Sequence, residues 1–390
     1  MPVINRIADL QDNITAWRRD LHEHPELMFD VHRTAGIVEQ KLKEFGCDEV
    51  VTGIGRTGVV AVIKGKTNTS GKVIGMRADM DALPIIEASG VEHTSTVEGK
   101  MHACGHDGHT AMLLGAAQYL AETRNFDGEV VVIFQPAEEG GGGGKEMVDD
   151  GMMERFGVQE VYGMHNMPGA AVGDFAIRPG PYMAAADKLE INITGKGGHA
   201  AMPHTTVDTT LVGAHIMLAL QSIVSRNLDP IDTLVVSITT FNTEGDAFNV
   251  IPENAKLKGT VRSYTPEAQD LAEERIRAIV ENIATAMGAT ATVDYHRDYP
   301  ATVNHAEQTQ KAADVAAAIV GEDRVERDQP PVMGSEDFSF MLNARPGAFI
   351  FVGNGDTAAL HHPEYDFNDE LIPVGCSYWA KLAETLMPAA

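Results

Sequence analysis

The chain has 390 residues, more than one hydrophobic core usually holds, so we expect two domains. Its 30 Lys and Arg residues against 56 Asp and Glu residues give a net charge of −26, which disfavours nucleic acid and anionic membranes as partners. Three widely spaced cysteines do not form a disulfide framework. The N-terminus has no signal-peptide pattern and the chain has no long apolar run, so we expect a cytoplasmic protein.

The pattern of apolar residues predicts the elements. The first 45 residues carry apolar side chains at helical spacing. Five apolar runs then indicate buried strands: TGVVAVIKG (57–65), KVIGMRADMDALP (72–84), EVVVIFQPAEEG (129–140), VYGMHNMPG (161–169) and GAFIFVGNG (347–355). Buried strands that alternate with helical segments are typical of an α/β fold, with a mainly parallel sheet and helices on both faces.

Between about residues 181 and 295 the pattern changes. Strand-like segments there alternate apolar and polar residues, so each is expected to have one exposed face: KLEINITGKG (188–197), TLVVSITTFN (233–242) and NAKLKGTVRSY (254–264). Helical patterns cover 205–226 and 266–287. We therefore expect a discontinuous α/β domain, 1–181 and 296–390, interrupted by an α+β domain at 182–295.

Two glycine-rich stretches resemble nucleotide-binding motifs but fail their requirements. GIGRTG (53–58) is followed by a predicted strand, whereas the dinucleotide-binding motif needs a helix there. EEGGGGGKE (138–146) lacks both the first glycine and the final Ser or Thr of a phosphate-binding loop. Neither stretch predicts a nucleotide site.

Candidate metal ligands follow the ends of successive predicted strands. They are Cys104, His106, Glu138, Glu139, His165, and His361 or His362. Loops at the carboxyl ends of parallel strands converge on one crevice, so these side chains can meet there. The mixture of S, N and O ligands suits zinc or another late first-row metal, and the carboxylates leave room for manganese.

The composition of this set favours a catalytic metal site over a structural one. It contains one nearby cysteine and surplus carboxylates, whereas a structural zinc site is commonly closed by four Cys and His ligands. The two adjacent acids can have separate roles, because Glu139 can hold a metal while Glu138 acts as general base toward water.

Eight stretches spread in order along the chain resemble the M20 metallopeptidase family, in particular its branch of bacterial hippurate hydrolases and plant auxin-conjugate amidohydrolases. They are MRADMDALP, MHACGHDGHTAMLLGAA, FQPAEEGGGGGKEMVDDG, GMHNMPG, GKGGHAAMPH, FNVIPENAKLKGTVRSY, MGSEDFSF and LHHPEYDFND. The resemblance implies an enzyme with a metal-binding catalytic domain, split by a smaller domain used for dimerisation.

The resemblance also implies a paired-metal centre with two divalent ions, which would be zinc, manganese, cobalt or nickel. Its ligands would be Cys104, His106, Glu139, His165 and His361, with Cys104 in a bridging position. Glu138 would be the base, and Asp81 would orient a ligand from outside the coordination sphere. The alternative for Asp81 is a turn residue before Leu83 and Pro84.

Three further roles fall inside the inserted domain. The resemblance implies that His199 crosses from a partner subunit and stabilises the oxyanion of the reaction. It implies that Asn249 and Arg262 hold the free carboxylate of the substrate. The alternatives are a surface-loop histidine for His199 and an ordinary strand ion pair for Arg262.

The expected activity is hydrolysis of the amide bond of an N-acyl-L-amino acid, of the hippurate or N-acetyl kind, by a homodimer. One alternative is a dipeptidase or small-peptide carboxypeptidase with the same centre. Another is a non-catalytic metal-binding scaffold of the same fold. The position of His361 in its motif favours it over His362 as the ligand.

Overall fold

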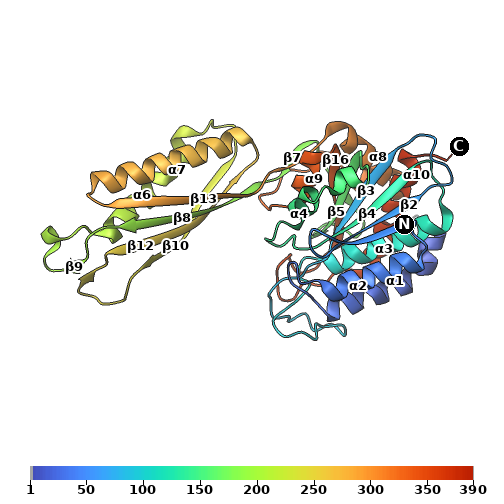
Figure 1. Ribbon diagram of the computed structural model, residues 1–390, viewed down its shortest axis with the longest axis horizontal. Coiled ribbons are helices and arrows are strands. Elements are labelled where there is room, and N and C mark those ends of the chain that lie inside the picture. The colour runs from blue at the N-terminus through green and yellow to red at the C-terminus, as the bar shows by residue number, and fades with distance from the viewer. Residues whose placement is uncertain (1–2, 390) are drawn as a thin grey trace. The chain divides into compact units, whose positions relative to one another are not determined.

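The computed structural model describes residues 3–389, which form two compact units (Figure 1). Unit 1 comprises residues 3–182, 303–330 and 337–389, and unit 2 comprises 183–302 and 331–336. Short strands β7 (Gly180–Met183) and β14 (Thr302–Asn304) pair where the chain leaves unit 1 and returns to it. The chain order of unit 1 is therefore interrupted by unit 2.

Within the described residues, unit 1 contains an eight-stranded sheet in the order β1-β2-β4-β3-β5-β16-β6-β15. Its members are β1 (Glu49–Ile54), β2 (Gly58–Lys64), β3 (Val73–Asp79), β4 (Glu129–Gln135), β5 (Glu160–Pro168), β6 (Phe175–Ala176), β15 (Val325–Glu326) and β16 (Gly347–Gly355). Central strands β4, β3, β5 and β16 are parallel, whereas β1, β2 and β6 each pair antiparallel with a neighbour. The predicted mainly parallel α/β sheet is confirmed.

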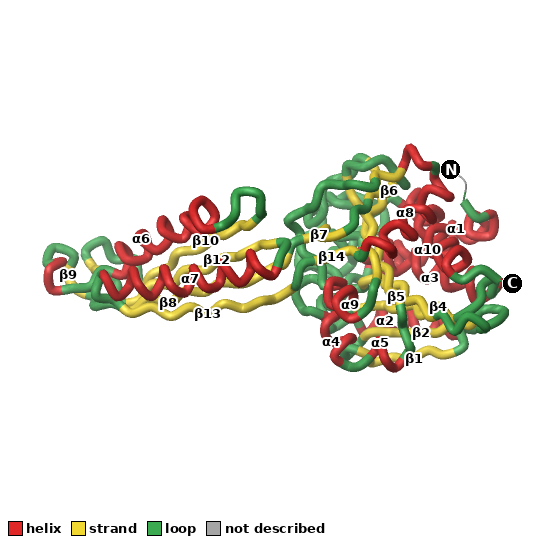
Figure 2. Tube along the Cα trace, turned by 90° about the horizontal axis from the view of Figure 1, so that it is seen from above, coloured by secondary structure: helices red, strands yellow, loops and turns green. Residues whose placement is uncertain are grey.

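Helices cover both faces of this sheet (Figures 1 and 2). One layer consists of α1 (Asn5–Glu23), α2 (His32–Glu44), α3 (His106–Thr123), α8 (Ala306–Val320) and α10 (Ile372–Leu386). The other consists of α4 (Gly143–Asp149), α5 (Met152–Arg155) and α9 (Phe338–Ala344). Short 3₁₀ turns lie at η3 (Glu322–Arg324) and η4 (Asp369–Leu371). Among residues 3–389, no helix has the length and apolar character needed to cross a membrane.

The sheet and helix α3 form the core of unit 1. The β4 run EVVVIFQ is buried on both faces because helices cover both sides of the sheet. Helix α3 is buried around almost its whole circumference, and its small residues allow close packing. A side chain added at Gly115, for example, would approach Ile14 Cδ1 to 2.5 Å. The loop that precedes α3 is therefore fixed to the rigid centre of the unit.

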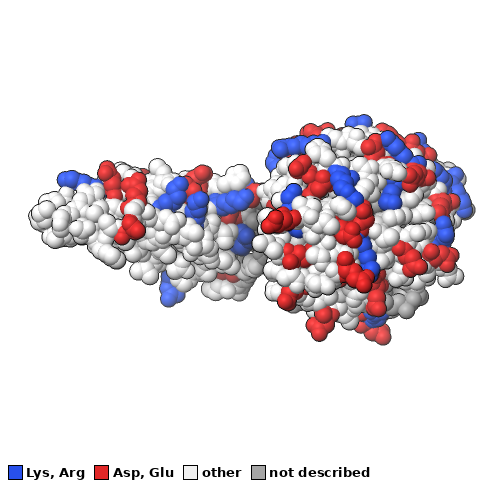
Figure 3. Space-filling model, turned by 90° about the horizontal axis from the view of Figure 1, so that it is seen from below, with Lys and Arg blue, Asp and Glu red and all other residues white. Residues whose placement is uncertain are grey.

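Unit 2 contains an antiparallel sheet in the order β10-β12-β8-β13. Its elements are β8 (Ala185–Thr194), β9 (Gly198–His199), η1 (Pro203–Thr205), α6 (Thr209–Ser222), the π-helical turn η2 (Ile223–Asn227), β10 (Leu234–Thr243), β11 (Val250–Ile251), β12 (Asn254–Ser263), α7 (Pro266–Ala286) and β13 (Thr290–Tyr299). Helices α6 and α7 pack on one face of the sheet, and side chains of β8 alternate between buried and more exposed positions. On the side seen in Figure 3, charged side chains of this unit gather along one margin.

Candidate metal centre

Four segments at the carboxyl edge of the unit 1 sheet carry the predicted ligands. Cys104 and His106 lie where the segment after β3 enters α3, Glu139 follows β4, His165 belongs to β5, and His361 follows β16. Gly105 between the first two has a φ of 90°, a left-handed conformation that favours glycine. The loop geometry turns Cys104 and His106 toward the same edge of the sheet.

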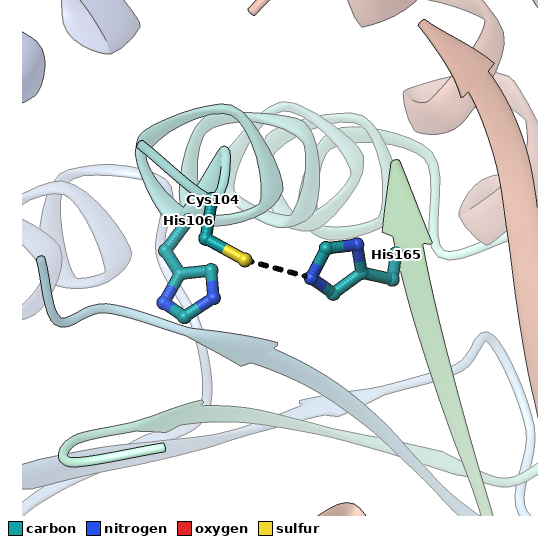
Figure 4. A group of neighbouring side chains, drawn as sticks. All are labelled: Cys104, His106 and His165. Atoms are coloured by element: carbon teal, nitrogen blue, oxygen red, sulfur yellow. Dashed lines mark hydrogen bonds between the residues drawn. The ribbon is translucent and has the colours of Figure 1, made fainter. Parts of the chain in front are cut away.

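The five predicted ligands fall into two groups, in each of which the ligand atoms lie within 4.8 Å of one another. The inner cluster is Cys104, His106 and His165, all buried, and Figure 4 shows the Cys104 sulfur pointing toward His165 with His106 beside it. The outer cluster is Cys104, Glu139 and His361. Cys104 belongs to both clusters, an arrangement that suits two adjacent metal ions with one shared ligand.

The two buried histidines of the inner cluster are held in the orientation typical of metal ligands. His106 Nδ1 donates to the Asp81 carbonyl at 2.8 Å, and His165 Nδ1 donates to the Asn166 carbonyl at 2.7 Å. Each Nε2 is then left to act as a ligand. His165 Nε2 lies 3.4 Å from Cys104 Sγ.

The ligand atoms of the two clusters fit a divalent cation. In the described part of the chain, His106 Nε2 is a buried atom without a hydrogen-bond partner, and so is Glu139 Oε1 apart from its ion-pair contact with His361 Nε2. Buried polar atoms are normally satisfied, so such an atom in the inner cluster and another in the outer cluster indicate a missing partner. Because imidazole, thiolate and carboxylate all donate electron pairs, a cation supplies what these atoms lack.

The electrostatics of the site also favour positive charge. Burial raises the pKa of the Cys104 thiol well above its usual value, and Glu139 and Glu138 raise it further. Burial alone would lower the pKa of His106, but nearby carboxylates, led by Asp79, raise it to about 10. A bound divalent cation would balance these carboxylates and convert the thiol to thiolate.

Asp81 and Glu138 lie directly beside the clusters. The Asp81 carboxylate accepts hydrogen bonds from the backbone N–H groups of Glu138, at 2.9 Å, and Glu139, at 3.1 Å. Asp81 therefore fixes the turn that carries both acids, in addition to orienting His106. Glu138 is only 7% exposed, and one of its carboxylate oxygens lies within 4.8 Å of the potential metal-ligand atoms of His106 and Glu139.

Between the two adjacent histidines after β16, His361 is the one beside the site. Its Nε2 lies 3.2 Å from Glu139 Oε1, and its φ of 63° is unusual for a residue other than glycine. The neighbouring His362 instead uses Nδ1 to accept a hydrogen bond from the Glu364 backbone at 3.1 Å.

Sequence reasoning missed Asp79 and His109, which support the inner cluster. Asp79 is fully buried and accepts a hydrogen bond from His109 Nδ1 at 2.7 Å and one from Arg77 Nη1, also at 2.7 Å. His109 Nε2 accepts from the Asn166 backbone at 3.0 Å, so both of its nitrogens are occupied. His109 therefore acts as a support and not as a ligand. The one available signal was its position three residues after His106, on the same face of α3.

The three predicted residues of unit 2 do not all lie together. His199 pairs with Val250 across β9 and β11, and the Asn249 carbonyl accepts from Ala200 at 3.0 Å, so His199 and Asn249 are neighbours. Arg262 lies near the far end of β12, about 26 Å from Asn254 at the usual rise of an extended strand. Arg262 donates to Thr260 and to the Val261 carbonyl, and it forms no ion pair among the described residues.

The fold and this edge of the sheet define a class: an α/β protein with two adjoining groups of potential metal ligands and a buried acid beside them. The comparison with known families is consistent with this class. The chain belongs to Peptidase family M20/M25/M40, whose model matches residues 75–385.

Relatives align over nearly the whole chain. The chain is 45% identical to hippurate hydrolase from Campylobacter jejuni, with 98% of this chain and 99% of that protein covered. It is 40% identical to N-acetylcysteine deacetylase from Bacillus subtilis, with 94% of each covered. Among solved structures, the Bacillus subtilis YXEP protein, described as a dinuclear metal binding peptidase from the M20 family, matches with a TM-score of 0.84 and 35% identity over 98% of this chain and 100% of that one.

Proposed function

We propose that the protein is a metal-dependent amidohydrolase that cleaves N-acyl-L-amino acids to an amino acid and a carboxylic acid. The observation that carries this proposal is the sharing of Cys104 between two ligand clusters directly beside the buried acid Glu138. Hippurate hydrolase and N-acetylcysteine deacetylase, the two relatives named above, support it, because both names describe the removal of an acyl group from an amino acid.

In this proposal the centre holds two divalent ions, which would be zinc, manganese, cobalt or nickel. Their ligands are Cys104, His106, Glu139, His165 and His361. When bound, such ions polarise the scissile carbonyl and lower the pKa of water. The thiolate favours a softer ion such as zinc, and the carboxylate is compatible with manganese.

The remaining steps belong to protein side chains, with His199 supplied by the partner subunit. Glu138 accepts a proton from the attacking water as the oxygen–carbon bond forms at the amide carbonyl. The carbon–nitrogen bond then breaks, and Glu138 returns the proton to the leaving amine. Asp81 keeps Glu138 in position through its bond to the Glu138 backbone. His199 donates a hydrogen bond to the developing oxyanion.

The proposed assembly is a homodimer formed through the inserted domain, residues 182–295. Helix α6 exposes Leu211 and Leu218, which are 50% and 74% exposed, and such apolar surface suits a protein interface. His199 and Asn249 would act at the partner's active site, whereas Arg262 would act at the active site of its own chain. This arrangement is supported by the length of β12, which separates Arg262 from His199 and Asn249. The three free cysteines agree with a cytoplasmic location.

A panel of substrates tests the activity. Purified protein loaded with zinc, manganese, cobalt or nickel is incubated with hippurate, N-acetyl amino acids and dipeptides, each with a free or a blocked carboxylate. We expect turnover of the N-acyl amino acids, loss of turnover when the carboxylate is blocked, and loss on chelation. Failure to hydrolyse any of these amides with any of the four metals would leave the non-catalytic scaffold as the better account.

Hydrolysis of small peptides is the second candidate. It is favoured by the similarity to the YXEP protein, which is described as a peptidase. A peptidase would cleave dipeptides faster than N-acyl amino acids in the same panel, because the free amino group of the dipeptide would then be bound as well.

A further inference from the structure

Arg18 of helix α1 is a fully buried charged residue whose partners come from distant parts of unit 1. Its guanidinium donates through Nε to Asp369 Oδ1 at 2.8 Å and through Nη1 to Asp366 Oδ1 at 3.1 Å and Asp107 Oδ2 at 3.4 Å, and Nη2 lies 3.0 Å from His93 Nε2. A buried guanidinium is costly unless such partners surround it, so its position is closely specified.

The carboxylate partners of Arg18 lie in two segments of the chain, each of which carries a ligand of one cluster. Asp107 directly follows His106 in the first turn of α3. Asp366 and Asp369 lie downstream of His361, in a segment that has no helix or strand between Gly355 and Asp369. One guanidinium therefore joins helix α3, which begins with His106 of the inner cluster, to the irregular segment that carries His361 of the outer cluster.

Apart from Arg18, different contacts hold the segment that carries His106 and the segment that carries His361. We call these the inner side and the outer side. On the inner side, Asp107 also accepts a hydrogen bond from His22 Nδ1 at 2.8 Å, and α3 is packed into the core. On the outer side, the His361 backbone N–H donates to Ala103 at 2.7 Å, and the His361 side chain itself is half exposed. The segment after His361 is also held by Tyr365 Oη, which donates to Asn166 Oδ1 at 2.9 Å, and by the Asp366 carbonyl, which accepts from Asn354 Nδ2 at 3.1 Å. Arg18 contacts two carboxylates of that segment and one carboxylate on the inner side, so its loss should affect the outer side more.

We propose that Arg18 is a positioning residue that keeps the loop of His361 aligned with Cys104 and His106, so that the second metal ion binds tightly at the outer cluster. This inference rests on the proposed two-metal centre. Removal of groups that orient metal ligands typically lowers metal affinity by about 10–100-fold. We expect a loss of this size for the second ion, with the first ion held nearly as in wild type.

The test uses Arg18→Met, which keeps the length of the side chain and removes its charge. The matched control is Arg19→Met, because Arg19 contacts the same Asp369 carboxylate at 2.9 Å but from the surface, with its side chain 44% exposed. Metal-free proteins are titrated with Co²⁺, and both the absorption spectrum and competition with a chromophoric chelator are followed. We expect Arg18→Met to weaken only the second binding event, Arg19→Met to match wild type, and Arg18→Lys to recover part of the affinity.

The folding of the variant and the number of Co²⁺ ions that it binds decide whether the inference holds. Circular dichroism of the metal-free proteins reports whether Arg18→Met is folded. If it is not, Asp366→Asn takes its place with a smaller weakening in the same direction, because it removes one of the two charges that Arg18 contacts downstream of His361, together with the ion pair to His93. Two Co²⁺ ions bound with wild-type affinity in the folded variant would overturn the inference alone. Fewer than two ions in wild type would instead overturn the proposed centre, and the inference with it.

Discussion

At the scale of single residues, the sulfur of Cys104 determines the character of the site. It is the ligand atom common to both clusters, and burial together with nearby carboxylates raises the pKa of its thiol well above the usual value. Binding of a divalent cation must therefore release the thiol proton. The affinity for metal should depend strongly on this one side chain.

Replacement of Cys104 by serine tests this dependence. A serine hydroxyl does not ionise as a thiol does, so we expect metal affinity to fall by at least about tenfold and turnover to fall with it. Metal content after dialysis and the rate of hippurate hydrolysis measure the two effects. Cys376→Ser is the control, since Cys376 is buried in α10 and donates to the Met112 carbonyl at 3.2 Å. A Cys104→Ser protein that kept metal and turnover would remove the cysteine from the centre.

Replacement of Glu138 by glutamine separates proton transfer from metal binding. The amide cannot accept the proton of water, so we expect kcat to fall by about 10²–10⁴-fold while metal content stays at the wild-type level. Steady-state kinetics with parallel metal analysis provide the measurement. A wild-type rate in this variant would contradict the assigned base.

At the scale of elements, the short connection before α3 sets the relative positions of Cys104 and His106. Gly105 has a left-handed φ, and a side chain added there would approach Asn166 Nδ2 to 2.3 Å and Tyr365 Oη to 2.6 Å. Both neighbours are buried and hydrogen-bonded to each other at 2.9 Å, so they have little freedom to move away.

Gly105→Ala should therefore lower the free energy of unfolding by about 1–3 kcal/mol and weaken metal binding. The control is Gly36→Ala at an exposed position of helix α2, where a methyl group meets nothing within 4 Å. That substitution should stabilise the protein by about 0.5–1 kcal/mol. Urea unfolding of the metal-free proteins measures both changes, and equal stabilities for the two variants would refute this account of the connection.

The elements that could be predicted from the sequence are those with a strong apolar pattern. The buried run of β4 and the alternating run of β8 both became strands as expected. Strand β13 was missed, because half of its side chains are exposed and its sequence, TATVDYHRDY, carries few apolar residues. The support given by Asp79 to His109 was missed as well, because it depends on a contact between residues 30 positions apart that no local pattern records.

At the scale of the whole molecule, we propose that the reaction uses two subunits. His199 and Asn249 lie together near β9, whereas Arg262 lies near the opposite end of β12. One small substrate cannot contact both ends of this strand within a single chain. A dimer in which His199 and Asn249 serve the partner's centre while Arg262 serves that of its own chain would satisfy both sets of contacts.

Mixing two inactive variants tests this arrangement. Glu138→Gln and His199→Ala should each be nearly inactive alone. In a mixed dimer one site would combine the intact Glu138 of one chain with the intact His199 of the other. After subunit exchange of an equal mixture we expect about one quarter of wild-type activity, because half of the dimers are mixed and each has one intact site. No recovery, with exchange verified by mass spectrometry, would place His199 outside the partner's site.

The central claim is that Cys104 is shared by two metal ions. Diffraction data collected at the absorption edge of the bound metal would locate the ions directly. We predict two anomalous peaks, one in contact with Cys104, His106 and His165 and the other in contact with Cys104, Glu139 and His361. A single peak, or a peak held by Asp79, His106 and His109 with Cys104 unbound, would contradict the account.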